Sequence, residues 1–113
     1  SARDYVAALQ QRQQDQQKFL RSLTGLSALL TPTIATPPIP LDEVDQASTP
    51  AYFTRAGNYL GLCGLSVPMG LTGDGLPGGL QILGRGSEEG MTLRIGAAFE
   101  QKTGPFPHPW LDS

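Results

Sequence analysis

The uneven placement of proline and glycine is the feature that most constrains how this chain folds. Residues 1–23 contain neither, prolines crowd the stretch 32–50, and most of the 14 glycines fall between residues 57 and 90. Proline removes a backbone donor and glycine favours tight turns, so only the first stretch can form a long uninterrupted helix. The rest must consist of shorter elements joined by loops, with no internal repeat.

The glycine- and proline-free stretch predicts a helix over residues 4–23. Ser1 and Asp4 have the spacing of a capping box, and Gly25 supplies a stop. The apolar residues near one face are Tyr5, Leu9, Phe19 and Leu23. A last helix is predicted after Ser87, which is expected to cap it, and Gly104 and Pro105 end it. Its inner face is predicted from four-residue spacing: Met91, Ile95 and Phe99.

Three short apolar runs predict strands over residues 26–31, 65–71 and 79–84, the first of them buried. The turn residues Asp74-Gly75 join the last two runs as a hairpin. The proline-rich residues 32–46 predict a loop that packs Ile34, Ile39 and Leu41 where it can.

A middle helix is predicted to begin at Pro50, with Thr49 as its N-cap, and to end at Gly61. The tail after Pro105 is predicted to be extended, with Trp110 holding it to the body. The order helix, strand, helix, hairpin, helix predicts an α/β fold. Three short strands leave sheet edges open, and a larger sheet completed by another part of the protein would close them.

Charge and cysteine content narrow the classes of function. The net charge of −2 gives no electrostatic reason to expect nucleic acid or a membrane surface as a partner. The single cysteine, Cys63, allows neither an internal disulfide nor a thiolate metal cage, and it fits a cytoplasmic setting. No cofactor and no metal ion are predicted.

Several motifs suggest chemistry that their context does not favour. Residues 73–78 match G-x-G-x-x-G by letter, but they precede a strand, so a hairpin turn is favoured over a dinucleotide site. Residues 84–89 lead into a helix N-terminus, where two glutamates favour capping over anion binding, and Arg85 is expected to pair with a carboxylate. Asp42, Glu43 and Asp45 form an acidic cluster that is expected to be solvated.

Catalytic candidates are equally few. Cys63 and His108 are the only residues that could form a thiol–imidazole pair, and a buried cysteine with a surface histidine is favoured instead. Asn58 is a polar residue on an otherwise apolar helix, so its amide either ties loops together, which is favoured, or contacts a substrate. No catalytic residue is assigned.

Several segments together resemble the C-terminal region of the amidase signature family. They are DYVAALQQR (4–12), LLTPT (29–33), FTRAGNYLGLCGLSVPMG (53–70), GLPGGLQILG (75–84) and AAFE (97–100). The resemblance implies that residues 1–113 are a C-terminal segment of an amidase domain and not a complete catalytic domain. It also implies an α/β fold in which this segment forms part of a large mixed sheet flanked by helices.

The resemblance implies amide-bond hydrolysis by a parent enzyme with a serine nucleophile, a second serine in a cis peptide bond and a lysine base. Those residues belong to earlier segments of the family, so this segment alone is expected to be inactive. It would supply one wall of the acyl pocket, with Tyr52, Phe53 and Asn58 on the substrate side. Members that release ammonia from glutamine often carry an aspartate where this chain has Ala51, which argues against that substrate.

The implied partners are a small amide substrate, bound by the parent enzyme, and the N-terminal remainder of the amidase. The isolated chain is also expected to associate with itself, because its predicted strands are apolar on more than one face. The alternative is a self-standing interaction or structural domain without catalysis.

Overall fold

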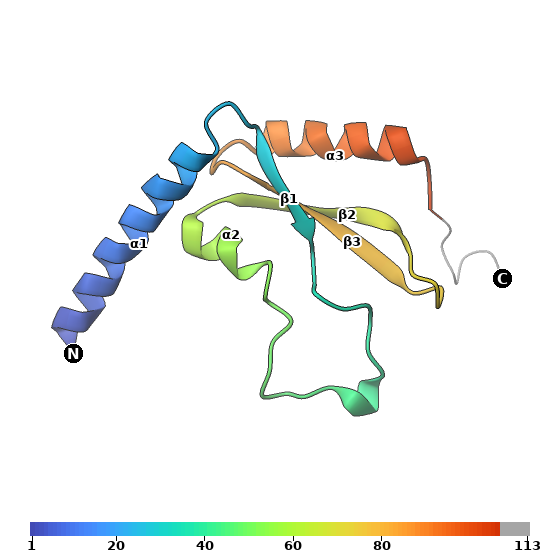
Figure 1. Ribbon diagram of the computed structural model, residues 1–113, viewed down its shortest axis with the longest axis horizontal. Coiled ribbons are helices and arrows are strands. Elements are labelled where there is room, and N and C mark those ends of the chain that lie inside the picture. The colour runs from blue at the N-terminus through green and yellow to red at the C-terminus, as the bar shows by residue number, and fades with distance from the viewer. Residues whose placement is uncertain (107–113) are drawn as a thin grey trace.

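The protein is described by a computed structural model of residues 1–106 (Figure 1). Its elements are α1 (Ala2–Ser22), β1 (Ala28–Pro32), a 3-10 turn (Leu41–Glu43), α2 (Arg55–Leu60), β2 (Cys63–Leu71), β3 (Pro77–Gly84) and α3 (Glu89–Thr103). The predicted order of helix, strand, helix, hairpin and helix is confirmed, and with it the α/β class. The predictions for His108 and Trp110 fall outside the described residues.

The three strands form an antiparallel sheet in the order β1-β3-β2. The predicted hairpin is confirmed: the Thr72 amide donates to the Leu76 carbonyl oxygen at 2.8 Å, and Gly75 has a φ of +76°. Ile82 of β3 lies between Leu30 and Leu65 in the register of the two ladders. Among the described strands, β3 alone is therefore paired along both edges.

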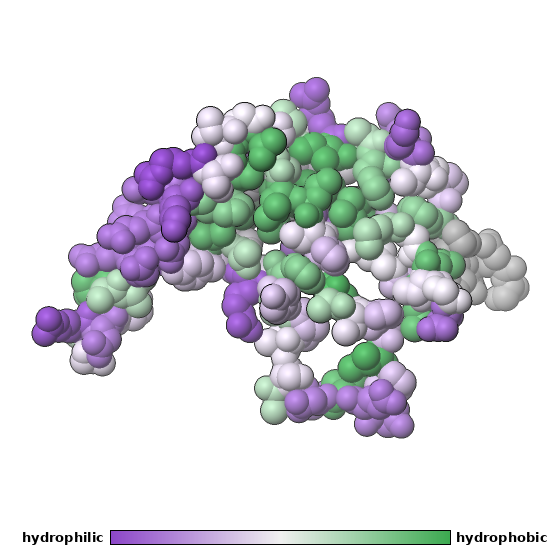
Figure 2. Space-filling view, in the orientation of Figure 1, coloured by the Kyte–Doolittle hydropathy of each residue, from purple (hydrophilic) through white to green (hydrophobic). Residues whose placement is uncertain are grey.

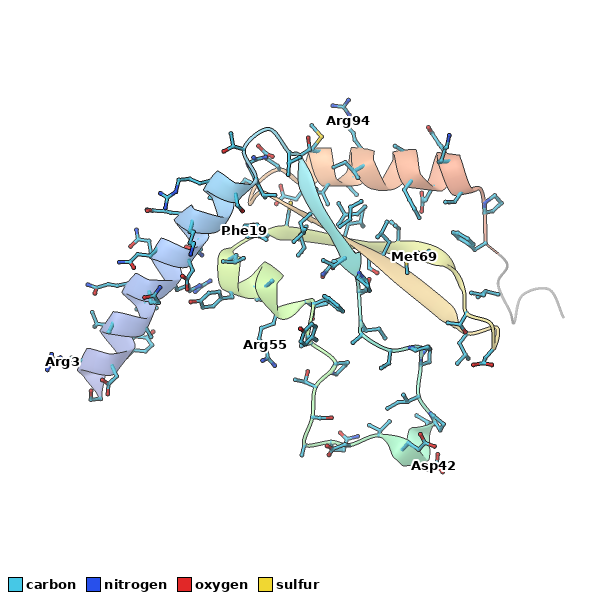
Figure 3. The ribbon with its side chains drawn as sticks, in the orientation of Figure 1. Arg3, Phe19, Asp42, Arg55, Met69 and Arg94 are labelled. Atoms are coloured by element: carbon cyan, nitrogen blue, oxygen red, sulfur yellow. The ribbon has the colours of Figure 1, made fainter. Side chains whose placement is uncertain are left out.

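Helix α3 covers one face of β2 and β3, and small residues let it approach closely (Figure 1). A Cβ atom at Gly96 would lie 2.6 Å from Leu65 Cδ2, and one at Gly84 would overlap the Thr92 hydroxyl. The buried residues of α3 are accordingly Thr92 and Gly96. The predicted inner face was therefore wrong by one position: Ile95 and Phe99 are only half-buried and Met91 is exposed. Arg94 points away from the sheet (Figure 3).

Gly96→Val is expected to lower the free energy of unfolding by about 1–3 kcal/mol, the usual cost of forcing extra methyl groups into a packed contact. The new side chain would meet Leu65 and Val67 on the sheet. Denaturant midpoints measure the loss. Gly90→Ala is the matched control, because nothing lies within 4 Å of a Cβ atom at that position of the same helix. It should be neutral or stabilising, and equal losses would contradict this helix–sheet contact.

Helix α1 and strand β1 lie largely outside this packing. β1 is an edge strand that α3 does not cover, so Leu29 and Leu30 are exposed and the predicted burial of this strand was wrong for the described chain. The proline loop is also exposed, including Ile34, Ile39 and Leu41, which were expected to pack. Figure 2 shows the apolar surface gathered over the sheet and the polar surface along α1.

The helix boundaries show which local signals prevail. The capping box of Ser1 and Asp4 is confirmed at the start of α1, and Gly61, with a φ of +66°, ends α2 as predicted. The middle helix, however, begins at Arg55 and not at Pro50. The cap of α3 is Glu88, since Ser87 adopts a left-handed conformation with a φ of +65°.

Candidate functional site

The sheet face opposite α3 carries a hydrogen-bonded group of polar side chains at its centre. Gln81 of β3 is 5% exposed, and its Nε2 donates to Thr31 Oγ1 at 2.9 Å and to the Phe53 carbonyl oxygen at 3.1 Å. Thr31, Gln81 and Ser66 are register partners on β1, β3 and β2, so they lie on the same face. One amide group therefore joins two strands to the segment that precedes α2.

A second polar contact crosses the central strand beside Gln81. The hydroxyl groups of Thr33 and Ser66 are 2.6 Å apart, although β3 runs between their segments. Gly79 makes this contact feasible, because a Cβ atom there would lie 2.9 Å from both hydroxyl oxygens. This geometry gives a physical reason for the third glycine of the GLPGGLQ block.

A groove of about 590 Å3 lies beside the hydroxyl pair. It is bounded by the start of the proline loop, the C-terminal half of β2 and the N-terminal end of β3. Its walls are mostly apolar and include Ile34, Val67 and Met69. Neither Tyr52 nor Phe53, which the sequence placed on the substrate side, lines it.

The structure brings two of the three predicted substrate residues together. The rings of Tyr52 and Phe53 meet edge to face, with centroids 4.9 Å apart and planes at 83°. Tyr52 is 79% exposed, whereas Phe53 is half-buried. Asn58 is exposed on α2 and lines a different groove, of about 390 Å3, together with Cys63 and Glu89. The aromatic pair and Asn58 thus do not share a groove in the described chain.

Arg12 joins α1 to the C-terminal end of α2. Its Nε donates to the Tyr59 carbonyl oxygen at 2.7 Å and its Nη2 to the Asn58 carbonyl oxygen at 3.0 Å. Carbonyl groups at a helix C-terminus lack intrahelical partners and attract cations, which explains an arginine at this point. In the sequence, Arg12 is notable only as the last residue of the DYVAALQQR block. Its acceptor, the Asn58 carbonyl oxygen, lies 46 residues away, and no local pattern indicates it.

The same contact includes a tyrosine–carboxylate pair. Tyr59 Oη donates to Asp15 Oδ2 at 2.8 Å, and Gln11 Nε2 donates to Asp15 Oδ1 at 3.0 Å. The bond to Asp15 raises the pKa of Tyr59, while the bonds from Tyr59 and Gln11 lower the pKa of Asp15. The hydrogen bond is therefore retained from the ordinary carboxyl range up to the ordinary phenol range, and it is lost as pH falls through the lowered pKa or rises through the raised one.

Arg85 closes the C-terminus of α1. It donates to the carbonyl oxygens of Leu23 at 2.7 Å and Leu26 at 2.8 Å. Among the described residues the expected pairing with a carboxylate was wrong, because the guanidinium donates to backbone carbonyl groups just beyond the end of α1 instead. Arg12 and Arg85 thus both donate to backbone carbonyl groups at or just beyond a helix C-terminus.

Two further candidates from the sequence, Cys63 and the acidic cluster, lie within the described part of the chain. Cys63 Sγ donates to the Arg85 carbonyl oxygen at 3.1 Å and lies 3.0 Å from Thr92 Oγ1, so its partners are not a catalytic base. Asp42, Glu43 and Asp45 are exposed as predicted, and Asp42 lies on the loop away from the sheet (Figure 3).

Residues 1–106 contain no group of three side chains placed to hold a metal ion. Within the same residues, no helix has the length and apolar character to cross a membrane.

Both a protein family and individual proteins of known sequence are similar to this chain. The family described as Amidase matches residues 1–93. A glutamyl-tRNA(Gln) amidotransferase subunit from Acidobacterium capsulatum is 41% identical over 100 residues, which are 85% of this chain and 21% of that protein. The protein of the same name from Salinibacter ruber is 44% identical over 86 residues, which are 71% of this chain and 17% of that protein.

Solved structures share the fold. A glutamyl-tRNA(Gln) amidotransferase subunit from Thermotoga maritima matches with a TM-score of 0.78 and 30% identity, over 96% of this chain and 26% of that one. A crystal structure of an amidase matches with a TM-score of 0.79 and 26% identity, over 90% of this chain and 25% of that one. The chain spans about a fifth of the length of the curated relatives that it matches.

Proposed function

This chain belongs to the amidase family, and from that membership we propose that it is the C-terminal segment of an enzyme that hydrolyses amide bonds. The single observation that carries the proposal is the family match over residues 1–93. The coverage of only about a fifth of the relatives supports the idea that the catalytic residues belong to another part of the parent protein.

The shape of the chain supports a role as part of a larger body. Its radius of gyration is 17.2 Å, whereas a compact domain of this length has about 13 Å. Tyr5, Val6 and Leu9 are exposed on the projecting part of α1, and Leu29 and Leu30 are exposed on the edge strand. Apolar surface of this kind on a small chain indicates a partner. We assign that partner to the N-terminal remainder of the amidase; self-association of the isolated chain would cover the same surface.

The proposed reaction follows the mechanism that the family resemblance implies. A serine attacks the amide carbonyl carbon, while a lysine, kept neutral by burial, accepts its proton through a second serine. The C–N bond then breaks, the amine leaves with that proton, and water hydrolyses the acyl-serine ester. Backbone N–H groups stabilise the oxyanion that develops in the transition state. This segment would contribute none of those groups. Its proposed role is to form a wall beside the acyl part of the substrate, with Tyr52, Phe53 and Asn58 facing that pocket.

The relatives are named as amidotransferases, and their name raises the question of glutamine as substrate. In this chain Ala51 stands where glutamine-using members often carry an aspartate. An aspartate would offer a carboxylate to the α-amino group of glutamine, and alanine offers none. We therefore propose a small amide other than glutamine as the preferred substrate.

A chimaera tests the function and the substrate class together. Residues 1–113 replace the matching region of the Acidobacterium capsulatum amidotransferase protein. We expect the chimaera to hydrolyse small amides, and we expect Ala51→Asp to raise its kcat/KM for glutamine about 10- to 100-fold, the worth of a charged hydrogen bond. Ala51→Asn, of similar size but without charge, is the control. A folded chimaera that turns over no amide would contradict the proposed function.

A further inference from the structure

We propose that Gln81 is a positioning residue that holds the Tyr52–Phe53 pair against the sheet and thereby sets the shape of the acyl-side wall. The inference rests on the proposed function for the identity of the pocket. The bonds that carry it are the two donated by the buried Gln81 amide, 2.9 Å to Thr31 Oγ1 and 3.1 Å to the Phe53 carbonyl oxygen.

Because Gln81 is buried, losing one of its hydrogen bonds costs more free energy than losing a hydrogen bond at the surface. Gln81 is 5% exposed at the centre of β3, the strand that is paired along both edges. A buried amide group that loses a partner is left without water to replace it, so its bonds are retained in the folded protein.

The order of donors and acceptors determines where the amide points. The Thr31 hydroxyl donates its own proton to the Pro32 carbonyl oxygen at 2.9 Å, so its oxygen is left to accept from Gln81. That contact holds one N–H of the Gln81 amide on β1. The second N–H is directed at the Phe53 carbonyl oxygen. The orientation of the amide is therefore set by the sheet, and Phe53 receives the remaining donor.

The segment that receives this donor has little other support. Tyr52 and Phe53 lie in turns between the exposed proline loop and α2, outside the sheet ladders. The nearest other anchors are two turn bonds, from the Arg55 amide to the Ala51 carbonyl oxygen and from the Gly57 amide to the Thr54 carbonyl oxygen. Beyond them, Gly57 approaches Leu83. Tyr52, which is highly exposed, is placed by its contact with the Phe53 ring. Releasing the Phe53 carbonyl would therefore displace both rings.

The test uses the full-length parent enzyme and its Gln81→Met variant, which keeps the volume of the side chain and removes both donors. We expect KM for small amides with aromatic acyl groups to rise about three- to tenfold, in proportion to one lost hydrogen bond, with kcat within about twofold. Hydrogen exchange of the backbone amides in residues 51–55 should accelerate by a similar factor. Thr92→Val is the matched control, because Thr92 is a comparably buried polar residue, 3% exposed, on α3, which covers the other face of the sheet. It should change stability and leave KM unchanged.

The outcomes separate this inference from the proposed function. A rise in KM together with faster exchange, seen for Gln81→Met and not for Thr92→Val, supports positioning. Faster exchange with unchanged KM would make Gln81 a structural anchor and overturn the inference, while turnover by the unaltered enzyme would still uphold the proposed function. Unchanged exchange would overturn it as well. An unaltered enzyme without amide turnover would refute the proposed function, and the substrate role of Gln81 with it.

Discussion

The isolated 113-residue chain is expected to hydrolyse no amide. The mechanism proposed for the parent enzyme needs a serine nucleophile, a second serine and a lysine base, which the family resemblance assigns to earlier segments. The described residues offer no substitute, since the Cys63 thiol is engaged by the Arg85 carbonyl and the Thr92 hydroxyl. Removal of a complete nucleophile–base set costs on the order of a million-fold in turnover. Part of the rate that survives such a loss comes from the oxyanion hole, which the family resemblance also assigns to earlier segments, so no turnover above buffer is expected.

Small aliphatic and aromatic amides, incubated with the purified chain, measure this prediction. Cys63→Ala and His108→Ala are the informative controls, because these residues are the only thiol and imidazole in the sequence. Turnover above buffer that disappears in either variant would contradict the proposed role of the chain as a segment without catalytic residues. It would also revive the thiol–imidazole alternative.

The second large effect is expected at the centre of the sheet. Ile82 is 0% exposed, and Ile82→Ala should cost about 2–5 kcal/mol in the free energy of unfolding, the usual range for emptying a well-packed site. The side chain lies under α3, close to where a Cβ atom of Gly96 would stand. Because whole domains are stable by only about 5–15 kcal/mol, such a loss is a large part of the total.

Leu30→Ala is the matched control for Ile82→Ala. The two residues are direct register partners on neighbouring strands, but Leu30 is 54% exposed because α3 does not extend over β1. Its truncation should cost well under about 1 kcal/mol, because the side chain has little buried surface to lose. Denaturant midpoints distinguish the two sites. Equal losses would show that Leu30 is covered in solution, as self-association through β1 would cause.

The two faces of the sheet differ in the side chains that they carry and in the elements that pack on them. The face under α3 is apolar: it carries the fully buried Ile82, and Gly84 and Gly96 allow the helix to approach closely. The opposite face carries the Gln81 and Thr33–Ser66 hydrogen bonds and receives the Tyr52–Phe53 segment. Helix packing therefore stabilises the first face, while hydrogen bonds from the second face hold the Tyr52–Phe53 segment.

Local signals in the sequence were sufficient for several features. The Ser1–Asp4 capping box, the Asp74-Gly75 turn and the stop at Gly61 each depend on residues within one turn of the chain, and the structure confirms all three. The strand positions and the α/β order followed from the same kind of short-range pattern. The family blocks added the class of protein, which the comparison over residues 1–93 confirms.

Tertiary structure decided what depends on distant residues. Four-residue spacing identified an apolar face of α3, but the face that packs is the one with Gly96, because only a glycine lets the helix backbone approach Leu65. Pro50 and Thr49 gave a valid local start for α2, yet the helix begins at Arg55, after the segment whose Phe53 carbonyl bonds to Gln81. The partners of Gln81, Arg12 and Arg85 lie 28 to 62 residues away, at distances along the chain where sequence spacing carries no directional information.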